Sequence, residues 1–271
     1  YYQKINNNIY LIQILFRECN MKNKTVVITG GTKGIGRNLC EMFYENGYFI
    51  IIGARNSNGV DEIDRKKISF LSMDVRNEED HLKLKDIALN YSNCLDVWIN
   101  NAGVSSWCPI ERIDNNFFNE LIDVNLKGAF WGCKAAVSQM KKQKYDSIIN
   151  ISSLAGKRGS KNNSMYCATK FGMNGLTQSL AKELGDSEIK VNAICPVLVK
   201  TEGLIKALGS SYSPAEGNPA LFLENFRKSN ASTKALPDGY DVANLALFLA
   251  SEKNKSITGQ CINVDSGVFP Q

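Results

Sequence analysis

The stretch TGGTKGIG, residues 29–36, follows a short apolar run at Thr25–Ile28 and precedes a helical pattern. Its spaced glycines allow the backbone to approach a ligand, and the start of a helix offers free N–H groups to an anion. The stretch is not a P-loop, because Arg37 and Asn38 stand where that motif needs Lys and Ser or Thr. Its spacing, G-x-x-x-G-x-G, also differs from the usual dinucleotide fingerprint G-x-G-x-x-G, so we expect a related but distinct turn.

Seven short apolar runs rich in β-branched residues are typical of strands buried on both faces of a sheet. They lie at residues 24–29, 48–53, 68–75, 95–100, 146–152, 189–195 and 261–265. Helical stretches between nearly all of them predict an α/β fold: one domain with a doubly wound, parallel, seven-stranded sheet of Rossmann type and helices on both faces. Ligands of such sheets bind beyond the carboxyl ends of the strands. The residues expected to converge there are Gly30–Gly36, Arg55, Asp74, Asn100–Gly103, Ser152, Ser153 and Pro196–Thr201.

The composition disfavours several classes of function. The 271 residues, 44% of them hydrophobic, suffice for a large core, and the net charge of +5 comes from scattered lysines. We interpret the densest run, KKQK at 141–144, as a solvated helix end rather than a nucleic-acid site. Eight cysteines without a C-x-x-C pair or neighbouring histidines indicate neither a metal site nor a disulfide framework. The single histidine, His81, is expected on a surface helix, which leaves a Ser–His or Cys–His nucleophile without a base.

The first twenty residues are interpreted as a tail that is disordered or not native, with an added surface helix as the alternative. Their apolar run, IYLIQILF at 9–16, is too short to span a bilayer and lacks the features of a signal peptide. No other targeting signal is recognisable in the sequence. We therefore expect a single domain at 21–271, a cytoplasmic location and no membrane partner.

The stretch MYCATK, residues 165–170, places a phenol and an ammonium four residues apart on a helix expected from about Asn163 to Leu184. Tyr166 and Lys170 therefore lie on one face of that helix. A phenol with its ordinary pKa of about 10 transfers protons poorly at neutral pH, and a nearby ammonium is expected to lower that pKa. Such a pair alone is more often a surface pair, but its combination with the glycine turn, Asn-Asn-Ala-Gly and Ser-Ser favours a proton-transfer site.

Together these motifs resemble the short-chain dehydrogenase/reductase family from about Lys22 to Phe269, and most closely its 3-oxoacyl-carrier-protein reductases. The motifs are TGGTKGIG, MDV at 73–75, NNAG at 100–103, DVNLKG at 123–128, ISS at 151–153, YCATK at 166–170 and ITGQCINVDSG at 257–267. The resemblance implies an NAD(P)-dependent enzyme that interconverts a ketone and a secondary alcohol by hydride transfer.

The resemblance implies four catalytic residues: Asn125, Ser153, Tyr166 and Lys170. Tyr166 would exchange the proton on the substrate oxygen, which Ser153 would hold by a hydrogen bond. Ser153 rather than Ser152 has the family's spacing of thirteen positions before the tyrosine. Lys170 would bind the ribose hydroxyls and lower the pKa of the phenol. Asn125 would fix a helix distortion and a water, although a purely structural hydrogen bond is an open alternative.

The resemblance also implies the cofactor contacts, with the pyrophosphate on the glycine turn and the adenine at Asp74 and Val75. Arg55 stands near the position where NAD-preferring members carry a carboxylate, and no carboxylate follows until Asp61. With Lys33 as a second cation, NADP(H) is expected in preference to NAD(H). The expected contact residues are Gly30, Thr32, Lys33, Gly34, Ile35, Gly36, Arg55, Asp74, Val75, Asn101, Ala102, Gly103, Tyr166, Lys170, Pro196, Val199 and Thr201.

Two regions bear on the substrate. Val197 replaces the glycine usual in the family after the sixth strand, so the backbone could be strained there. Residues Glu202–Ser232, expected as a substrate lid, mix apolar and basic side chains, which suits an acyl thioester or equally a lid helix packing its own apolar face. The acidic stretch ELGDSE at 183–188 argues against carrier-protein docking and leaves a sugar or another small carbonyl compound open.

Two other classes were weighed against this enzyme. A sugar-nucleotide epimerase is disfavoured by the glycine spacing. A non-catalytic NADP-binding regulator is disfavoured because Ser153, Tyr166 and Lys170 are all present. By resemblance to the family, a homotetramer is expected, with a dimer as the alternative.

Overall fold

The computed structural model describes residues 24–60, 67–143 and 146–270, so the expected tail at 1–20 lies outside the described residues. All seven expected strands are present and pair in parallel in the order β3-β2-β1-β4-β5-β6-β7. The strands are β1 (Thr25–Thr29), β2 (Phe49–Ala54), β3 (Ile68–Ser72), β4 (Val97–Asn100), β5 (Ser147–Ile151), β6 (Lys190–Pro196) and β7 (Cys261–Val264). Because the strand order reverses between β1 and β4, a crevice forms at their carboxyl ends.

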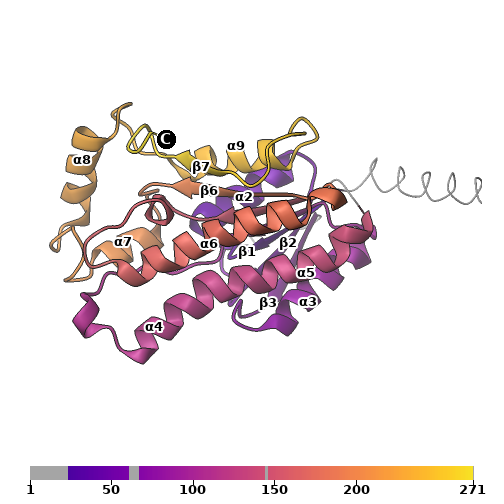
Figure 1. Ribbon diagram of the computed structural model, residues 1–271, viewed down its shortest axis with the longest axis horizontal. Coiled ribbons are helices and arrows are strands. Elements are labelled where there is room, and N and C mark those ends of the chain that lie inside the picture. Colours follow the sequence, from indigo (N-terminus) through magenta and orange to yellow (C-terminus); the bar gives the residue numbers. More distant parts are fainter. Residues whose placement is uncertain (1–23, 61–66, 144–145, 271) are drawn as a thin grey trace, which may run out of the picture.

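Helices cover both faces of the sheet, as predicted (Figure 1). They are α2 (Gly34–Glu45), α3 (Glu78–Ser92), α4 (Asn115–Leu121), α5 (Gly128–Gln143), α6 (Ser164–Glu183), α7 (Glu202–Leu208), α8 (Pro219–Asn230) and α9 (Gly239–Ala250). Helices α2 and α9 pack on one face around side chains such as Phe43 and Ile50. Helices α3, α5 and α6 pack on the other face around Ile51 and Trp98. The β-branched strand residues are therefore buried from both sides.

Short turns complete the framework around the carboxyl ends of the strands. The 3₁₀ turns are η3 (Ile110–Arg112), η5 (Leu154–Gly156) and η6 (Gly185–Ser187), and η4 (Ile122–Lys127) is a π-helical turn between α4 and α5. π-helical turns are rare and often mark functional sites. The expected helix distortion at Asn125 is therefore observed.

His81 lies on the surface helix α3, as expected, but its own side chain is fully buried. Its helix α3 presents His81, Leu84 and Ala88 on one face, with the spacing i, i+3 and i+7. This apolar periodicity directs the imidazole into the core, close to the indole of Trp98.

Other sequence expectations concern metals, thiols and membrane spans. The described residues contain no group of His, Cys, Asp and Glu side chains that could hold a metal ion. Six of the described cysteines carry free thiols and Cys94 is disulfide-bonded, so no framework of disulfides forms among them. Within the same residues, no helix has both the length and the apolar character needed to cross a bilayer.

Candidate active site

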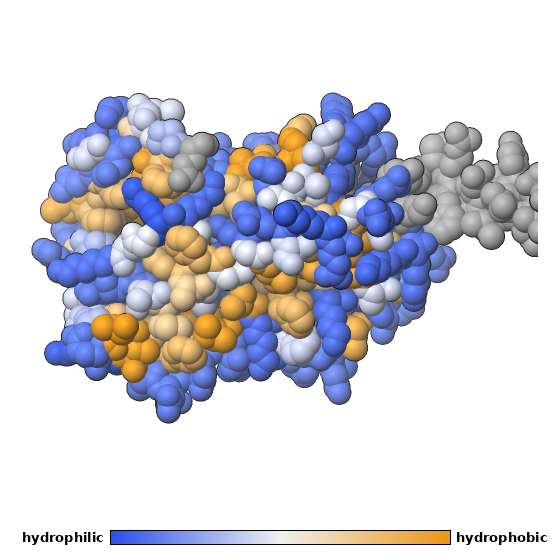
Figure 2. Space-filling view, viewed as in Figure 1, coloured by the Kyte–Doolittle hydropathy of each residue, from blue (hydrophilic) through white to orange (hydrophobic). Residues whose placement is uncertain are grey.

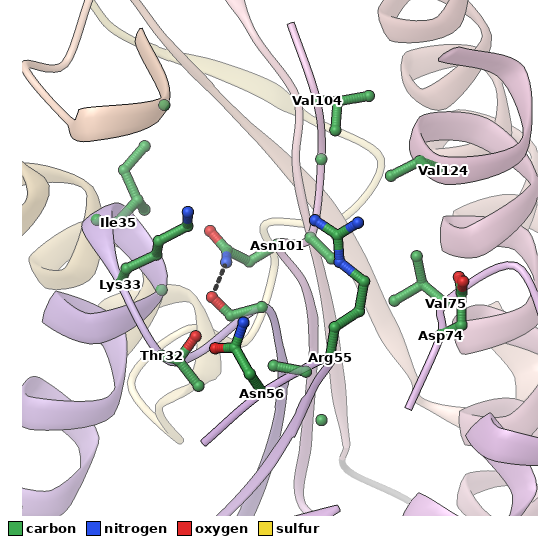
Figure 3. A pocket seen from close by; sticks show the side chains of 18 of the residues that line it. Thr32, Lys33, Ile35, Arg55, Asn56, Asp74, Val75, Asn101, Val104 and Val124 are labelled. Atoms are coloured by element: carbon green, nitrogen blue, oxygen red, sulfur yellow. Dashed lines mark hydrogen bonds between the residues drawn. The ribbon is translucent and has the colours of Figure 1, made fainter. Parts of the chain in front are cut away.

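A cleft of about 320 Å³ opens at the carboxyl ends of β1, β2 and β4, where the sequence predicted it (Figure 3). Most of the predicted cofactor residues line it. These are Gly30, Thr32, Lys33, Gly34, Ile35, Gly36, Arg55, Asp74, Val75, Asn101, Ala102, Gly103 and Thr201. The sequence analysis missed several other lining residues, including Asn56, Arg76, Val104, Val124 and Glu202.

The glycine turn is shaped by two residues with left-handed backbone, Gly30 (φ +68°) and Gly34 (φ +54°). A Cβ at Gly36 would lie 2.1 Å from the carbonyl oxygen of Gly30, so only glycine fits there. Asn101 holds the turn, because its Nδ2 donates to the carbonyl oxygens of Thr29 (2.9 Å) and Gly30 (3.1 Å). The N-terminus of α2, which has no side-chain cap, therefore faces the cleft with free N–H groups, an arrangement that fits a pyrophosphate.

The cations predicted to select the cofactor lie on this cleft. Figure 3 shows the side chains of Lys33 and Arg55 extending into it from different walls. Both residues are exposed and available to a bound anion. Asp74 and Arg76 also line the cleft, where Arg76 Nε donates to Asp74 Oδ2 at 2.9 Å. This contact holds the pKa of Asp74 below its usual value. The charge of Asp74 is therefore largely balanced by the arginine two residues along the chain.

Asn125 is fully buried in the π-helical turn η4 and bonded to the backbone of Val104, the residue directly after the NNAG segment. Its Oδ1 accepts from the N–H of Val104 at 2.8 Å, and its Nδ2 donates to the carbonyl oxygen of Val104 at 2.9 Å. A Cβ at Gly103 would lie 3.2 Å from Asn125 Oδ1 and 3.8 Å from Lys170 Nζ. The amide thus fixes the backbone beside Lys170, which agrees with the structural alternative for Asn125 and also places it at the site.

Helix α6 carries Tyr166 and Lys170 to the end of β5, where the ammonium Nζ lies 5.8 Å from the centre of the phenol ring. Lys170 is buried, and its Nζ donates to the carbonyl oxygen of Ile151 at 2.8 Å. Ser153 is the N-cap residue of η5, and its side chain acts on Tyr166 by lowering the pKa of the phenol against the effect of burial. Ser152 instead points into the core toward the carbonyl oxygen of Lys170, so the structure distinguishes the two serines as the sequence analysis did.

The expected lowering of the Tyr166 pKa is not observed. Burial raises the pKa of Tyr166 to about 12, and the hydrogen bond from Ser153 opposes that rise only in part. Burial also lowers the pKa of Lys170 to about 8, because no carboxylate among the described residues lies beside the ammonium to offset the loss of water. In this structure burial is therefore the largest influence on the pKa of both groups, and it disfavours the charged form of each.

Backbone strain was expected at Val197, after β6, but the structure has it at the next residue. Val197 is buried and its N–H donates to the carbonyl oxygen of Val264 at 3.2 Å, without a left-handed backbone. The strained residue is its neighbour Leu198, with φ +41°. Pro196 and Val199, two predicted contacts, are buried and lie outside the lining of the cleft.

The expected lid at 202–232 contains α7 and α8, which pack around Trp107. The buried part of this cluster is apolar and includes Leu208 and Leu223. Arg112 Nη1 donates to the hydroxyl of Tyr212, and Asn162 Nδ2 donates to its carbonyl oxygen. The segment between α7 and α8 is therefore attached to η3, which follows β4, and to the loop that precedes α6.

Comparison with known proteins agrees with this geometry. The chain matches the short chain dehydrogenase family over residues 24–208. A 3-oxoacyl-(acyl-carrier-protein) reductase of Chlamydia trachomatis is 32% identical over 254 residues, which cover 91% of this chain and 97% of that protein. The structure of ElxO with NADP bound has 32% identity and a TM-score of 0.80, and the match covers 92% of this chain and 99% of ElxO.

A third similar protein is the 3-ketoacyl-(acyl-carrier-protein) reductase of Brucella melitensis, whose structure is a complex with NADH. It has 25% identity and a TM-score of 0.80, and the match covers 91% of this chain and 98% of that one. The seven-stranded parallel sheet, the glycine turn and these similarities lead to one assignment. The chain belongs to the short-chain dehydrogenase family and is an NAD(P)-dependent oxidoreductase.

Proposed function

We propose that this enzyme reduces a ketone to a secondary alcohol with NADP(H), using Asn125, Ser153, Tyr166 and Lys170. The observation that carries the proposal is that Lys170 Nζ lies 5.8 Å from the centre of the phenol ring of Tyr166, with Ser153 placed where it lowers the pKa of that phenol against the effect of burial. A bound nicotinamide cofactor supplies the hydride. Ser153 orients the substrate oxygen, and Tyr166 donates a proton to that oxygen. Lys170 holds positive charge near the phenol, and Asn125 keeps the adjoining backbone in place.

The preference for NADP(H) rests on this chain's own cations, because the similar structures hold both cofactors, NADP in ElxO and NADH in the Brucella reductase. Arg55 and Lys33 line the cleft, and the described part of the segment after β2 has no carboxylate that would repel a phosphate. Each charge-assisted hydrogen bond to a 2′-phosphate contributes about 1.5–3 kcal/mol.

The substrate proposed first is a 3-oxoacyl thioester. The apolar cluster around Trp107, beside α7 and α8, supports this substrate, because its side chains offer apolar contacts to an acyl chain. The names of the similar reductases of Chlamydia and Brucella also favour it. The alternative is a sugar or another small carbonyl compound. The acidic residues Glu183 and Asp186 near the end of α6 favour this alternative, because they argue against docking of a carrier protein there.

We also propose that the protein is a homotetramer, with a dimer as the alternative. Helices α4, α5 and α6 expose Phe118, Phe130 and Phe171, each more than 40% accessible, and Figure 2 shows hydrophobic side chains over this face. The edge strand β7 is only partly covered as well. A monomer in solution at micromolar concentration would contradict the proposal. The cytoplasmic location and the lack of a nucleic-acid partner stay predictions.

The proposed function can be tested by following NADPH oxidation with three substrate classes: acyl thioesters, small ketones and nucleotide keto-sugars. We expect turnover with at least one class, and most strongly with 3-oxoacyl thioesters. The Tyr166→Phe variant serves as the matched control, because it keeps the ring but lacks the acid. Turnover confined to keto-sugars would favour the alternative substrate, and equal turnover by the control would refute the assignment of the tyrosine.

A further inference from the structure

The only histidine of the chain lies directly behind the wall of the cofactor cleft. His81 belongs to the first turn of α3, is fully buried, and has its ring centroid 6.0 Å from that of Trp98. Its Nε2 lies 2.9 Å from the carbonyl oxygen of Val75, a residue that lines the cleft. Since a carbonyl oxygen only accepts, Nε2 carries the proton and donates it.

The second ring nitrogen shows that the imidazole is held in one neutral form. Nδ1 of His81 is buried and has no hydrogen-bond partner among the described residues. A proton on Nδ1 would leave a buried donor without an acceptor, which is costly. Burial lowers the pKa of His81, in agreement with the geometry. The neutral ring therefore serves as a donor to Val75 and makes no other hydrogen bond in the described structure.

The segment that His81 supports is a turn at 73–77 between β3 and α3. Asp80 Oδ2 accepts from the N–H of Asp74 at 3.2 Å, and Asn77 Oδ1 accepts from the N–H of Glu79 at 3.1 Å. On its other side Val75 meets α5, where a Cβ at Gly128 would lie 3.1 Å from the Val75 side chain and 3.2 Å from its carbonyl oxygen. The Val75 carbonyl is thus enclosed by two helices, and His81 is the group that satisfies it.

We propose that His81 is a positioning residue for the cofactor: by bonding the Val75 carbonyl it holds the Val75 side chain against the adenine. This rests on the proposed contact between Val75 and the adenine. Without the imidazole donor the part-buried Val75 carbonyl would turn toward another partner, and the side chain on the cleft wall would turn with it. The reacting atoms near Tyr166 are at a different part of the site and would not be affected.

The test compares two substitutions that differ in one donor. His81→Gln can place an amide N–H near the position of Nε2, whereas His81→Leu fills the space without a donor. Binding is titrated with NADPH, with adenosine 2′,5′-bisphosphate as a probe of the adenine end, and with nicotinamide mononucleotide as a probe of the other end. Ala88→Gly, on the same face of α3 two turns away, controls for a general loss of stability.

We expect His81→Leu to weaken NADPH and the bisphosphate about tenfold, because an unsatisfied buried carbonyl costs on that scale. Nicotinamide mononucleotide binding and kcat at saturating NADPH should stay within about twofold of the wild type. His81→Gln and Ala88→Gly should bind the bisphosphate like the wild type. A folded His81→Leu variant with unchanged bisphosphate affinity, or equal weakening by Leu and Gln, would overturn the role of His81. If the wild type binds neither NADPH nor adenosine 2′,5′-bisphosphate, the proposed cofactor site itself is refuted.

If His81→Leu does not fold, His81→Met takes its place, because Met also fills the space with an apolar side chain and has no donor. We expect His81→Met to bind the bisphosphate about tenfold more weakly than His81→Gln does. Equal bisphosphate affinities of folded Met and Gln variants would overturn the role of His81.

Discussion

The two ends of the parallel sheet both carry polar side chains but use them differently. At the amino ends, Asp96 Oδ2 accepts from the N–H and the hydroxyl of Thr25, at 2.7 and 3.2 Å. Lys190 Nζ there donates to the carbonyl oxygens of Ser251 and Asn254, at 3.3 and 2.8 Å. At the carboxyl ends, Lys33 and Arg55 are exposed on a cleft. The binding site is the end at which polar groups are left accessible to a ligand.

The titration of acids separates the two ends further. Burial, helped by the neighbouring Asp96, raises the pKa of Asp146, at the amino ends, to about 9. At the carboxyl ends, Arg76 keeps the pKa of Asp74 low. A charge at the amino ends therefore opposes folding, whereas charges at the carboxyl ends are compensated or exposed. Substitutions at the carboxyl ends should change kinetics, and substitutions at the amino ends should change stability.

The largest effect is expected from Tyr166→Phe, which should lower kcat by about 10²–10⁴ because it removes the proton donor but keeps the ring. NADPH affinity should stay nearly unchanged. Lys170→Met should weaken both kcat and cofactor binding, because it removes the buried ammonium and a contact to the ribose. Steady-state kinetics and NADPH titrations of both variants check this difference. Normal turnover by the Phe variant would leave the tyrosine as a packing residue.

Arg55→Ala should lower NADP(H) affinity about tenfold or more, since one charge-assisted hydrogen bond to the 2′-phosphate is lost. NAD(H) affinity should change little, because NAD(H) has no 2′-phosphate. Titration of the wild type and the variant with both cofactors measures the two changes. Equal losses for both would mean that Arg55 supports the cleft generally and does not recognise the phosphate.

Asp146→Asn should stabilise the protein increasingly as pH rises, at the opposite end of the sheet from the site. The pKa of Asp146 is raised to about 9 in the folded state and is about 4 when unfolded. Its contribution is thus greatest below about pH 4 and is lost as pH rises toward 9. Linkage changes the free energy of unfolding by about 1.4 kcal/mol for each pH unit between these two pKa values, so from pH 5 to about pH 9 the variant should gain several kcal/mol relative to the wild type. Urea unfolding at both pH values tests this, and an equal difference at both would contradict it.

The smallest expected effect is a shift in the pH profile of alcohol oxidation by the Ser153→Ala variant. This shift comes in addition to a loss of rate. In alcohol oxidation Tyr166 must lose its proton, so activity should rise with pH. The hydrogen bond from Ser153 lowers the pKa of Tyr166 against the effect of burial. Without that bond the rising limb should move to higher pH. A profile that stays in place or moves lower would show that Ser153 does not stabilise the phenolate.

Most of the fold and much of the site could be predicted because they depend on local patterns. The β-branched runs predict the strands, and the four-residue spacing of Tyr166 and Lys170 predicts their shared helix face. Burial and its consequences could not be predicted in the same way. The pKa of Tyr166 depends on the elements packed around it, and the strain at Leu198 depends on how β6 meets β7.

The buried position of His81 could be predicted from the sequence only in part. A signal existed in the spacing of His81, Leu84 and Ala88, but three positions in a charged helix are a weak pattern. Its hydrogen bond to Val75 requires a turn whose geometry no local pattern defines. Arg76, which pairs with Asp74, could have been found from its position two residues later.

Hydride transfer can be followed directly with NADPH deuterated at C4, using each of the two stereoisomers and any ketone that the wild type accepts. Mass spectrometry of the alcohol then shows whether deuterium has reached the former carbonyl carbon. We expect one deuterium per product molecule from one stereoisomer and none from the other, with product formation nearly abolished in Tyr166→Phe. An alcohol free of deuterium with both stereoisomers, or undiminished labelling by the Phe variant, would contradict the proposed reaction at this site.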